Sequence, residues 1–97
     1  MRNSVQQKVH TLILRSNDGY WEPRKVMQKI LEECHELARE VNRRSANKAA
    51  IEKEAGDLLF AIACLLNPRG ISFDRAIEKS IRKFSRRDSR LYQRKRS

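Results

Sequence analysis

The sequence predicts an all-α protein, a helical bundle of about four helices per chain that is completed by homodimerisation. Apolar residues recur every three to four positions in four segments, and no segment shows the period-two alternation of a strand. The 97 residues are 39% hydrophobic and 35% charged, with only three Gly and two Pro. This composition is typical of a compact helical protein. A chain of this length forms a single domain, residues 1–97, with a small buried surface that favours pairing with a second copy.

The first two helices have recognisable start and stop residues. Ser4 is the expected N-cap of a helix that runs to about Arg15, before a turn at residues 17–19. Pro23, at the first helical position, begins a second helix that ends near residues 42–45. The predicted core stripes of these helices are Val5, Val9, Leu12 and Ile13 in the first, and Val26, Ile30, Cys34, Leu37 and Val41 in the second.

The third helix is expected from about Asn47 to Leu66. Its second half, residues 58–66, is apolar on all sides, and such a helix is predicted to be buried. Pro68 and Gly70 then end it, because one cannot continue a helix and the other favours a turn.

The fourth helix is expected to begin after Ser72, which serves as its cap, and to continue to about residue 92. Residues 88–97 form a basic tail that is either a helical extension or disordered. The apolar residues that this helix is predicted to bury are Phe73, Ile77, Ile81 and Phe84.

Charge and cysteine content limit the partners and the compartment. The net charge of +10 is concentrated in residues 67–97, which carry eleven basic and three acidic side chains. Cys34 and Cys64 lack metal-ligand spacing and are expected to be free, buried thiols in a reducing compartment. With no recognisable signal peptide and no long apolar run, the sequence predicts a cytoplasmic protein with no membrane partner.

Five carboxylates on the second and third helices make the most informative pattern. Two like charges 4 Å apart repel by roughly 4 kcal/mol at an effective dielectric of 20, and burial beside apolar side chains adds a desolvation cost. One turn before Asp57 stands Lys53, while Glu54 has no such neighbour. A divalent cation would remove this conflict, and all-oxygen ligation favours Mg²⁺, with Mn²⁺ as a substitute. The carboxylates are those of Glu32, Glu33, Glu36, Glu54 and Asp57.

An ordinary solvated helix face is the alternative for the first part of this acidic set. Lys25 and Lys29 lie on the same stripe as Glu33, Glu36 and Glu40, so the face could be held by ion pairs between residues four apart. Glu54 and Asp57 on the third helix are harder to explain as a solvated face, because an apolar segment, residues 58–66, follows them directly.

The acidic pattern resembles a known family signature. Residues 32–36 read Glu-Glu-Cys-His-Glu, and residues 54–57, after a gap of seventeen, read Glu-Ala-Gly-Asp. This order is similar to the EExxE and ExxD motifs of the MazG-like, all-α nucleoside triphosphate pyrophosphohydrolases, and the resemblance covers roughly residues 20–88. The flanking residues that support it are Trp21, Pro23, the run Gly56 to Phe60, Ala76, Ile77, Lys83, Phe84 and Arg87.

The resemblance implies Mg²⁺-dependent cleavage between the α and β phosphates of a nucleoside triphosphate, giving the monophosphate and pyrophosphate. It implies a homodimer or tetramer and a house-cleaning role in the nucleotide pool. By the same resemblance, Glu32 is a further ligand or orients the attacking water, which makes it a catalytic candidate together with Glu33. The implied metal ligands are Glu33, Glu36, Glu54 and Asp57.

Three further residues are candidates for binding the substrate. Lys83 and Arg87 flank the apolar arc of the fourth helix, where cations can reach a metal-held phosphate. Trp21 could stack on a base, or it could be a hydrophobic staple that packs on Val26. Ile81 stands where relatives often have Asn, which leaves the nucleotide preference open.

Other functions are compatible with parts of the sequence. The basic last third, with aromatic residues among its charges, could make the chain a nucleic-acid-binding module without catalysis. Phosphoribosyl-ATP pyrophosphohydrolase is an alternative within the superfamily, although Lys83 and Arg87 fit it less well. Glu32 and His35 form an ExxH pair, and a homodimer would present two such pairs with Glu54 from each chain, as in a di-iron carboxylate bundle. That function gives Glu33, Glu36 and Asp57 no role.

Overall fold

Four helices account for almost the whole chain. The structure, a computed structural model, describes the backbone of residues 4–96 and the side chains of residues 4–86. Within residues 4–96 there is no strand, so the all-α prediction is confirmed. In chain order the elements are α1 (Val5–Arg15), α2 (Pro23–Val41), α3 (Lys48–Leu66), the short 3₁₀ helix η1 (Asn67–Arg69) and α4 (Phe73–Arg96).

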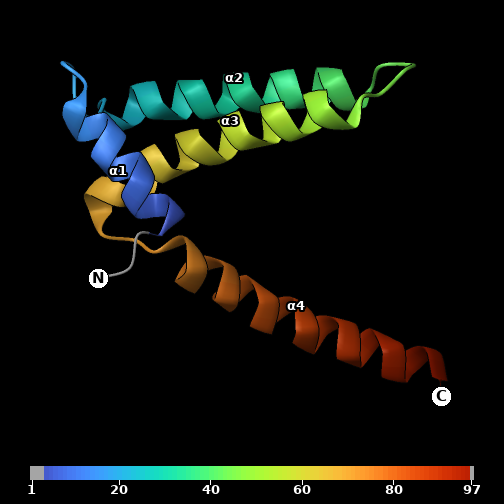
Figure 1. Cartoon of the computed structure of the whole chain (residues 1–97). Helices are drawn as coiled ribbons and strands as arrows, with labels where there is room; N and C mark the ends of the chain where they lie inside the picture. Colours follow the sequence, from blue (N-terminus) through green and yellow to red (C-terminus); the bar gives the residue numbers. More distant parts are fainter. Residues whose placement is uncertain (1–3, 97) are drawn as a thin grey trace.

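The long helices α2 and α3 form an antiparallel hairpin (Figure 1). The much shorter α1 crosses the open end of this hairpin, where α2 begins and α3 ends, while α4 runs away from it (Figure 1). The hairpin is therefore the main packing unit of the molecule. Because a short turn joins α2 and α3, side chains on the two helices can contact one another along their length.

The boundaries follow the capping residues that the sequence predicts. The Ser4 hydroxyl accepts a hydrogen bond from the backbone N–H of Gln7 at 3.1 Å, and Pro23 is the first residue of α2. Gly19 and Gly70 have φ values of 62° and 66°, a left-handed conformation that other residues rarely adopt. These predicted helix starts and turns are confirmed.

The core within one chain is smaller than the predicted stripes. The main contact of α1 with the hairpin is at α3, and one side chain of its stripe, Val9, is buried. On α2, Val26 is buried and Ile30 and Leu37 are half-buried, but Cys34 and Val41 are exposed, so the predicted stripe is only partly correct. In the part of the chain that the structure describes, the buried apolar side chains are those of Val9, Val26, Ala61 and Ala63.

The prediction that α3 is buried on all sides is only partly correct. Ala61 and Ala63 are enclosed, but Leu59 and Phe60 are exposed because α2 and α1 cover only part of the helix surface. For the same reason Cys34 is exposed and Cys64 is half-buried, which corrects the prediction of two buried thiols; both are free. No described helix combines the length and the apolar character that a membrane span requires.

The prediction that α4 buries its apolar stripe is wrong within a single chain. Ile77, Ile81 and Phe84 are 57%, 50% and 55% exposed, since α4 diverges from the hairpin instead of packing on it (Figure 1). The radius of gyration is 17.1 Å, whereas a compact domain of 100 residues has about 13 Å. One chain alone therefore leaves much apolar surface in contact with water.

A set of hydrogen bonds holds the N-terminal end of α4 in place. The side-chain amide of Gln6 donates to the Asn67 side chain at 2.9 Å and to the carbonyl of Ile71 at 2.7 Å. Its oxygen accepts from the backbone N–H of Phe73 at 2.7 Å. The Asn67 amide in turn donates to the Tyr20 hydroxyl at 3.1 Å. The direction of α4 and the loop before α2 are thus tied to the same polar cluster.

Candidate functional site

Three of the predicted carboxylates meet between α2 and α3. One oxygen each of Glu33, Glu54 and Asp57 lies within 4.8 Å of the others, a set that could hold a metal ion. Glu33 comes from α2, and the other two lie one turn apart on α3. Glu33 is only 8% exposed and is the buried charged residue of the described part of the chain. We call these three residues the carboxylate cluster.

Two lysines neutralise part of the charge of the carboxylate cluster. Lys29 Nζ lies 3.2 Å from a Glu33 oxygen. Lys53 Nζ lies 3.4 Å from Glu54 and 3.3 Å from Asp57. The expectation that Glu54 lacks a cation was wrong, because the flexible Lys53 side chain reaches its sequence neighbour as well as the residue one turn away.

The same contacts raise the pKa of both lysines above the ordinary value of 10.5. For Lys29 the main cause is its hydrogen bond to Glu33, and for Lys53 it is the hydrogen bond to Asp57, followed by the one to Glu54. Both ammonium groups are therefore charged at neutral pH. Three carboxylates face two lysines, so the carboxylate cluster keeps an excess of negative charge that favours a cation.

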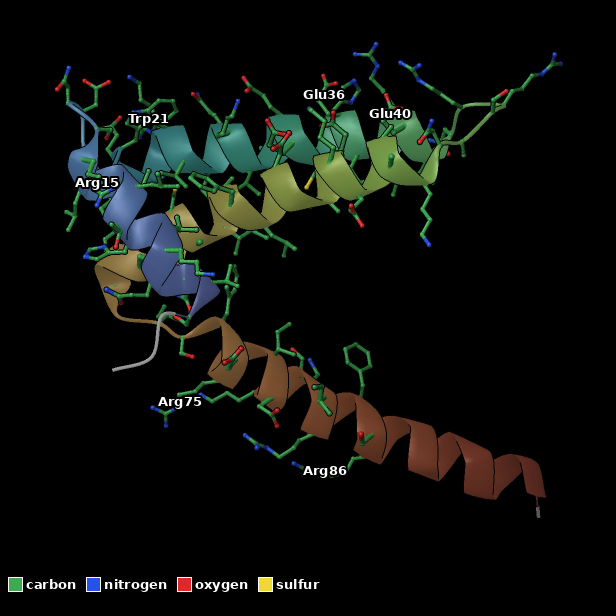
Figure 2. The ribbon with its side chains drawn as sticks, viewed as in Figure 1. Arg15, Trp21, Glu36, Glu40, Arg75 and Arg86 are labelled. Atoms are coloured by element: carbon green, nitrogen blue, oxygen red, sulfur yellow. The ribbon has the colours of Figure 1, made fainter. Side chains whose placement is uncertain are left out.

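The remaining acids of the first motif do not join the carboxylate cluster. Glu36 lies 3.5 Å from Arg39, and Glu40 lies 3.2 Å from Arg43. Figure 2 shows Glu36 and Glu40 further along α2, towards its turn into α3. The interpretation of an ion-paired helix face therefore describes this stretch, and a metal-ligating role of Glu36 stays a prediction.

Glu32 points to a more exposed side of α2 than Glu33. Its side chain is 68% exposed, and its carboxylate lies 3.7 Å from Lys29, the lysine that also binds Glu33. Glu32 lines a shallow depression together with His35 and Glu36. Within one chain, Glu54 lies with Glu33 and Asp57 in the carboxylate cluster and does not line this depression. The di-iron alternative requires two chains, and it stays a prediction.

A cleft of about 500 Å³ extends from the carboxylate cluster towards the turn between α1 and α2. Its size lies in the range of small-molecule sites. The carboxylates of Glu33 and Asp57 lie at one end, and the middle is mainly apolar. The lining residues are Ile13, Ser16, Asp18, Gly19, Tyr20, Trp21, Val26, Lys29, Glu33, Asp57, Phe60, Ala61 and Cys64.

Trp21 lies at the start of α2 (Figure 2) and lines the cleft together with Val26. Its ring is 48% exposed, and Lys25 Nζ lies 5.5 Å from the ring centroid. A cation over the face of an indole is a stabilising contact that holds the ring in place. Trp21 occupies the N′ position of a staple and is also open to a ligand, so both predicted roles stay compatible with its position.

The sequence alone did not indicate that the first turn contributes to the cleft. Asp18 and Tyr20 line the cleft because α1 crosses the open end of the hairpin, and no local pattern predicts that crossing. Cys64 and Phe60 also line it. The sequence indicated this only through their spacing, because Phe60 lies one turn and Cys64 two turns after Asp57 on the same helix.

The predicted phosphate-binding residues of α4 lie on a helix that diverges from the cleft. Lys83 is exposed on α4, which leads away from the hairpin (Figure 1). The side chain of Arg87 lies outside the described residues. Lys83 is not among the residues that line the cleft within one chain.

Replacement of Lys53 by Met tests whether a divalent cation takes over its charge. We expect Lys53→Met to lower the thermal midpoint in chelator, because Glu54 and Asp57 then repel without their shared cation. Mg²⁺ should restore this midpoint and bind more tightly to the variant than to the unaltered protein, since no ammonium group competes for the oxygens. Scanning fluorimetry across a Mg²⁺ titration measures both effects.

Lys48→Met is the matched control, because Lys48 is exposed at the start of the same helix and forms no ion pair among the described side chains. It should leave the Mg²⁺ response unchanged. Equal Mg²⁺ responses of Lys53→Met and the unaltered protein would contradict a cation at the carboxylate cluster.

Comparisons with known proteins identify the family of the chain. Residues 22–92 match the family described as the MazG nucleotide pyrophosphohydrolase domain. The chain is 36% identical to the uncharacterized protein YpjD of Bacillus subtilis, over 94% of this chain and 89% of that protein. It is also 37% identical to the Escherichia coli nucleoside triphosphate pyrophosphohydrolase, over 64% of this chain and only 24% of the length of that protein.

Two solved structures share the fold. The Bacillus-conserved MazG protein, a nucleotide pyrophosphohydrolase, superposes with a TM-score of 0.75 at 37% identity, over 81% of this chain and 83% of that one. The putative pyrophosphatase YPJD of Bacillus subtilis superposes with a TM-score of 0.74 at 38% identity, over 84% and 90%. With a family match across most of its length, the chain belongs to the MazG nucleotide pyrophosphohydrolase family.

Proposed function

We propose that the protein hydrolyses ribo- or deoxynucleoside triphosphates between the α and β phosphates, giving the nucleoside monophosphate and pyrophosphate, with Mg²⁺ as the cofactor and Mn²⁺ as a substitute. In the cell, the proposed role is the removal of unwanted nucleotides from the cytoplasmic pool. The observation that carries this proposal is the carboxylate cluster at one end of a cleft of about 500 Å³. Family membership supports the class of reaction.

The residues of the carboxylate cluster fit a hard divalent ion. Three carboxylate oxygens from Glu33, Glu54 and Asp57 lie within 4.8 Å of one another, and Mg²⁺ prefers a few carboxylates together with water and substrate phosphate oxygens. When bound, the ion would neutralise the charge that develops on the phosphates and lower the pKa of a bound water. The cluster also lies beside Lys29 and Lys53, which are then free to turn towards the substrate phosphates.

The other acids have subordinate roles in this proposal. Glu33 is buried and bonded to Lys29, so it is held in one position and can accept a proton as well as bind metal. Glu32 is linked to the cluster through the same lysine and orients the attacking water. Glu36 becomes a ligand only if its contact with Arg39 opens.

A homodimer, which could pair further into a tetramer, completes the proposed enzyme. Ile77 and Ile81 on α4 are 57% and 50% exposed, and a second copy would cover them. Because α4 leads away from the cleft of its own chain, Lys83 and Arg87 would reach a phosphate only at the cleft of a partner. The proposed substrate site is therefore composite.

The decisive assay is a panel of canonical and modified nucleoside triphosphates with Mg²⁺, in which pyrophosphate and orthophosphate are measured separately. We expect pyrophosphate in a one-to-one ratio with the nucleoside monophosphate. Orthophosphate as the sole product would contradict α–β cleavage. Turnover of phosphoribosyl-ATP alone would show that the protein is instead a phosphoribosyl-ATP pyrophosphohydrolase.

Nucleic-acid binding is a second candidate function, because α4 does not pack on the hairpin of its own chain. Its basic side chains are exposed along a helix that the hairpin does not cover, and such a helix can lie along a phosphate backbone. Steeply salt-dependent retention of an oligonucleotide that survives Glu54→Gln would favour this function. The bases that would make the contact are Arg75, Lys79, Arg82, Lys83 and Arg86.

The two cysteines provide an internal test of where the substrate binds. Cys64 lines the cleft, and burial raises the pKa of its thiol, so alkylation should be slow at neutral pH and faster at higher pH. A bound nucleotide should slow the labelling of Cys64 further without changing that of the exposed Cys34, which is outside the cleft. Mass spectrometry of each peptide gives both rates. Equal protection of the two thiols would contradict binding in this cleft.

A further inference from the structure

The carboxylate of Asp18 has no protein partner, although it lines the cleft. Lys29 binds Glu33 and Lys53 binds Asp57, so every other acid in the cleft lining has a lysine. Among the described side chains, none forms an ion pair or hydrogen bond with the Asp18 carboxylate. The cleft therefore carries paired carboxylates at one end and a single unpaired acceptor at the other.

The backbone around Asp18 is held in place. The Ser16 hydroxyl donates to the carbonyl of Ile13 at 2.7 Å and accepts from the backbone N–H of Gly19 at 3.2 Å. Gly19 has a φ of 62°, which a residue with a side chain rarely adopts. The turn thus holds the backbone beside Asp18, whose exposed side chain lines the cleft with its acceptor oxygens available to a ligand.

The length of α2 between its first residue and Glu33 suits a nucleotide. Glu33 is ten residues after the first residue of α2, which corresponds to about 15 Å along a helix that rises 1.5 Å per residue. This is comparable to the length of an extended nucleotide. Phosphates at the carboxylate cluster would leave the base beside Trp21 and Phe60, with its polar edge towards the turn that carries Asp18.

The chemistry of a carboxylate selects among bases. An ionised carboxylate only accepts hydrogen bonds, and its two oxygens suit two donors that stand side by side. Guanine has such a pair, because its ring N1–H is next to its exocyclic 2-amino group. Adenine and cytosine place a ring acceptor next to their amino group, and uracil and thymine place carbonyl oxygens on both sides of their single N–H, so each would meet the carboxylate with a repulsive atom.

We propose that Asp18 is a specificity-determining residue that binds the Watson–Crick edge of guanine, and that the cleft therefore prefers guanine nucleotides and modified bases that keep this edge. This inference rests on the proposed function for the identity of the ligand as a nucleotide. It adds the class of base and the residue that reads it.

Binding can be measured without catalysis because Trp21 is the single tryptophan of the chain. We titrate the full-length protein with GMP and with IMP, which lacks only the 2-amino group, and follow the tryptophan fluorescence. GMP should bind roughly 10- to 100-fold more tightly than IMP, as expected for a lost bidentate contact. Asp18→Asn should bring the two dissociation constants together by weakening GMP binding.

Glu52→Gln is the matched control, because Glu52 is an exposed acid on α3 outside the cleft, and it should keep the preference for GMP. Equal binding of GMP and IMP by the unaltered protein, an unchanged ratio in Asp18→Asn, or no fluorescence response to any nucleotide would each overturn the proposal. Triphosphate hydrolysis is assayed in parallel. Hydrolysis without a guanine preference contradicts this inference alone, whereas selective GMP binding without hydrolysis contradicts only the proposed reaction.

Discussion

Replacement of Glu54 by Gln is expected to abolish most nucleotide turnover while leaving the fold as stable as before. Glu54 supplies one of the three oxygens of the carboxylate cluster. An amide keeps the shape of the side chain but removes the negative charge that holds the cation. Loss of one electrostatic contact to the reacting groups typically costs about 10²- to 10³-fold in turnover, and we expect at least this loss.

The stability of Glu54→Gln should not fall with its activity. With one carboxylate fewer, repulsion within the cluster falls, so the thermal midpoint in chelator should stay the same or rise. The stabilisation by Mg²⁺ should shrink, because binding to the folded state alone raises stability in proportion to the logarithm of ligand concentration over Kd. Turnover, measured as pyrophosphate release, and scanning fluorimetry with and without Mg²⁺ separate the two effects.

Glu52→Gln on the same helix is the control for charge alone, since Glu52 is exposed and lies outside the carboxylate cluster. It should retain turnover and the Mg²⁺ response. If Glu54→Gln kept full activity with Mg²⁺, the carboxylate cluster could not be the catalytic centre, and the basic surface of α4 would become the better functional candidate.

Replacement of Ile81 by Glu is expected to separate the proposed dimer. Ile81 lies on the exposed apolar stripe of α4, and burying such a side chain contributes about 1.5–3 kcal/mol. A symmetric interface contains the residue twice. The dissociation constant should therefore rise by roughly 10²- to 10⁴-fold, since each 1.4 kcal/mol is tenfold. Analytical ultracentrifugation over a range of protein concentrations measures this change.

Turnover should fall together with dimerisation if Lys83 acts at the cleft of a partner. Activity of Ile81→Glu should then rise with protein concentration as dimers re-form. Lys79→Glu is the control, because Lys79 lies on the opposite side of α4 from Ile81 and changes charge without removing an apolar contact. A monomeric unaltered protein with full activity would contradict both the interface and the shared site.

Much of the hairpin could be predicted from the sequence because its signals are local. Pro23 suits the first position of α2 because its φ is preset and it has no N–H to satisfy. Asn47 caps α3, since its side-chain oxygen accepts from the N–H groups of Ala49 and Ala50 at 2.8 and 3.2 Å. That acids of α2 and α3 would share a site could also be predicted, since two amphipathic helices joined by a short turn must pack side by side. Helix period and caps depend on neighbouring residues only.

Burial was the part that local patterns predicted badly. The stripe of Ile77 and Ile81 has the period of a core-facing helix, yet α4 leaves its own hairpin and keeps these side chains exposed. A hydrophobic pattern states that a face needs a partner, but it does not state whether the partner belongs to the same chain. The direction of α4 depends instead on Gln6, which bonds residues more than sixty positions away.

The sequence by itself determined the helical class, the helix boundaries and the acidic motif, because each follows from residues within a few turns of one another. Only the tertiary structure decided that Glu33 joins the cluster while Glu32 and Glu36 face Lys29 and Arg39. It alone brought Asp18 to the rim of the cleft. The physical reason is that adjacent residues on a helix point about 100° apart, so the position of the neighbouring helix selects which of them meet.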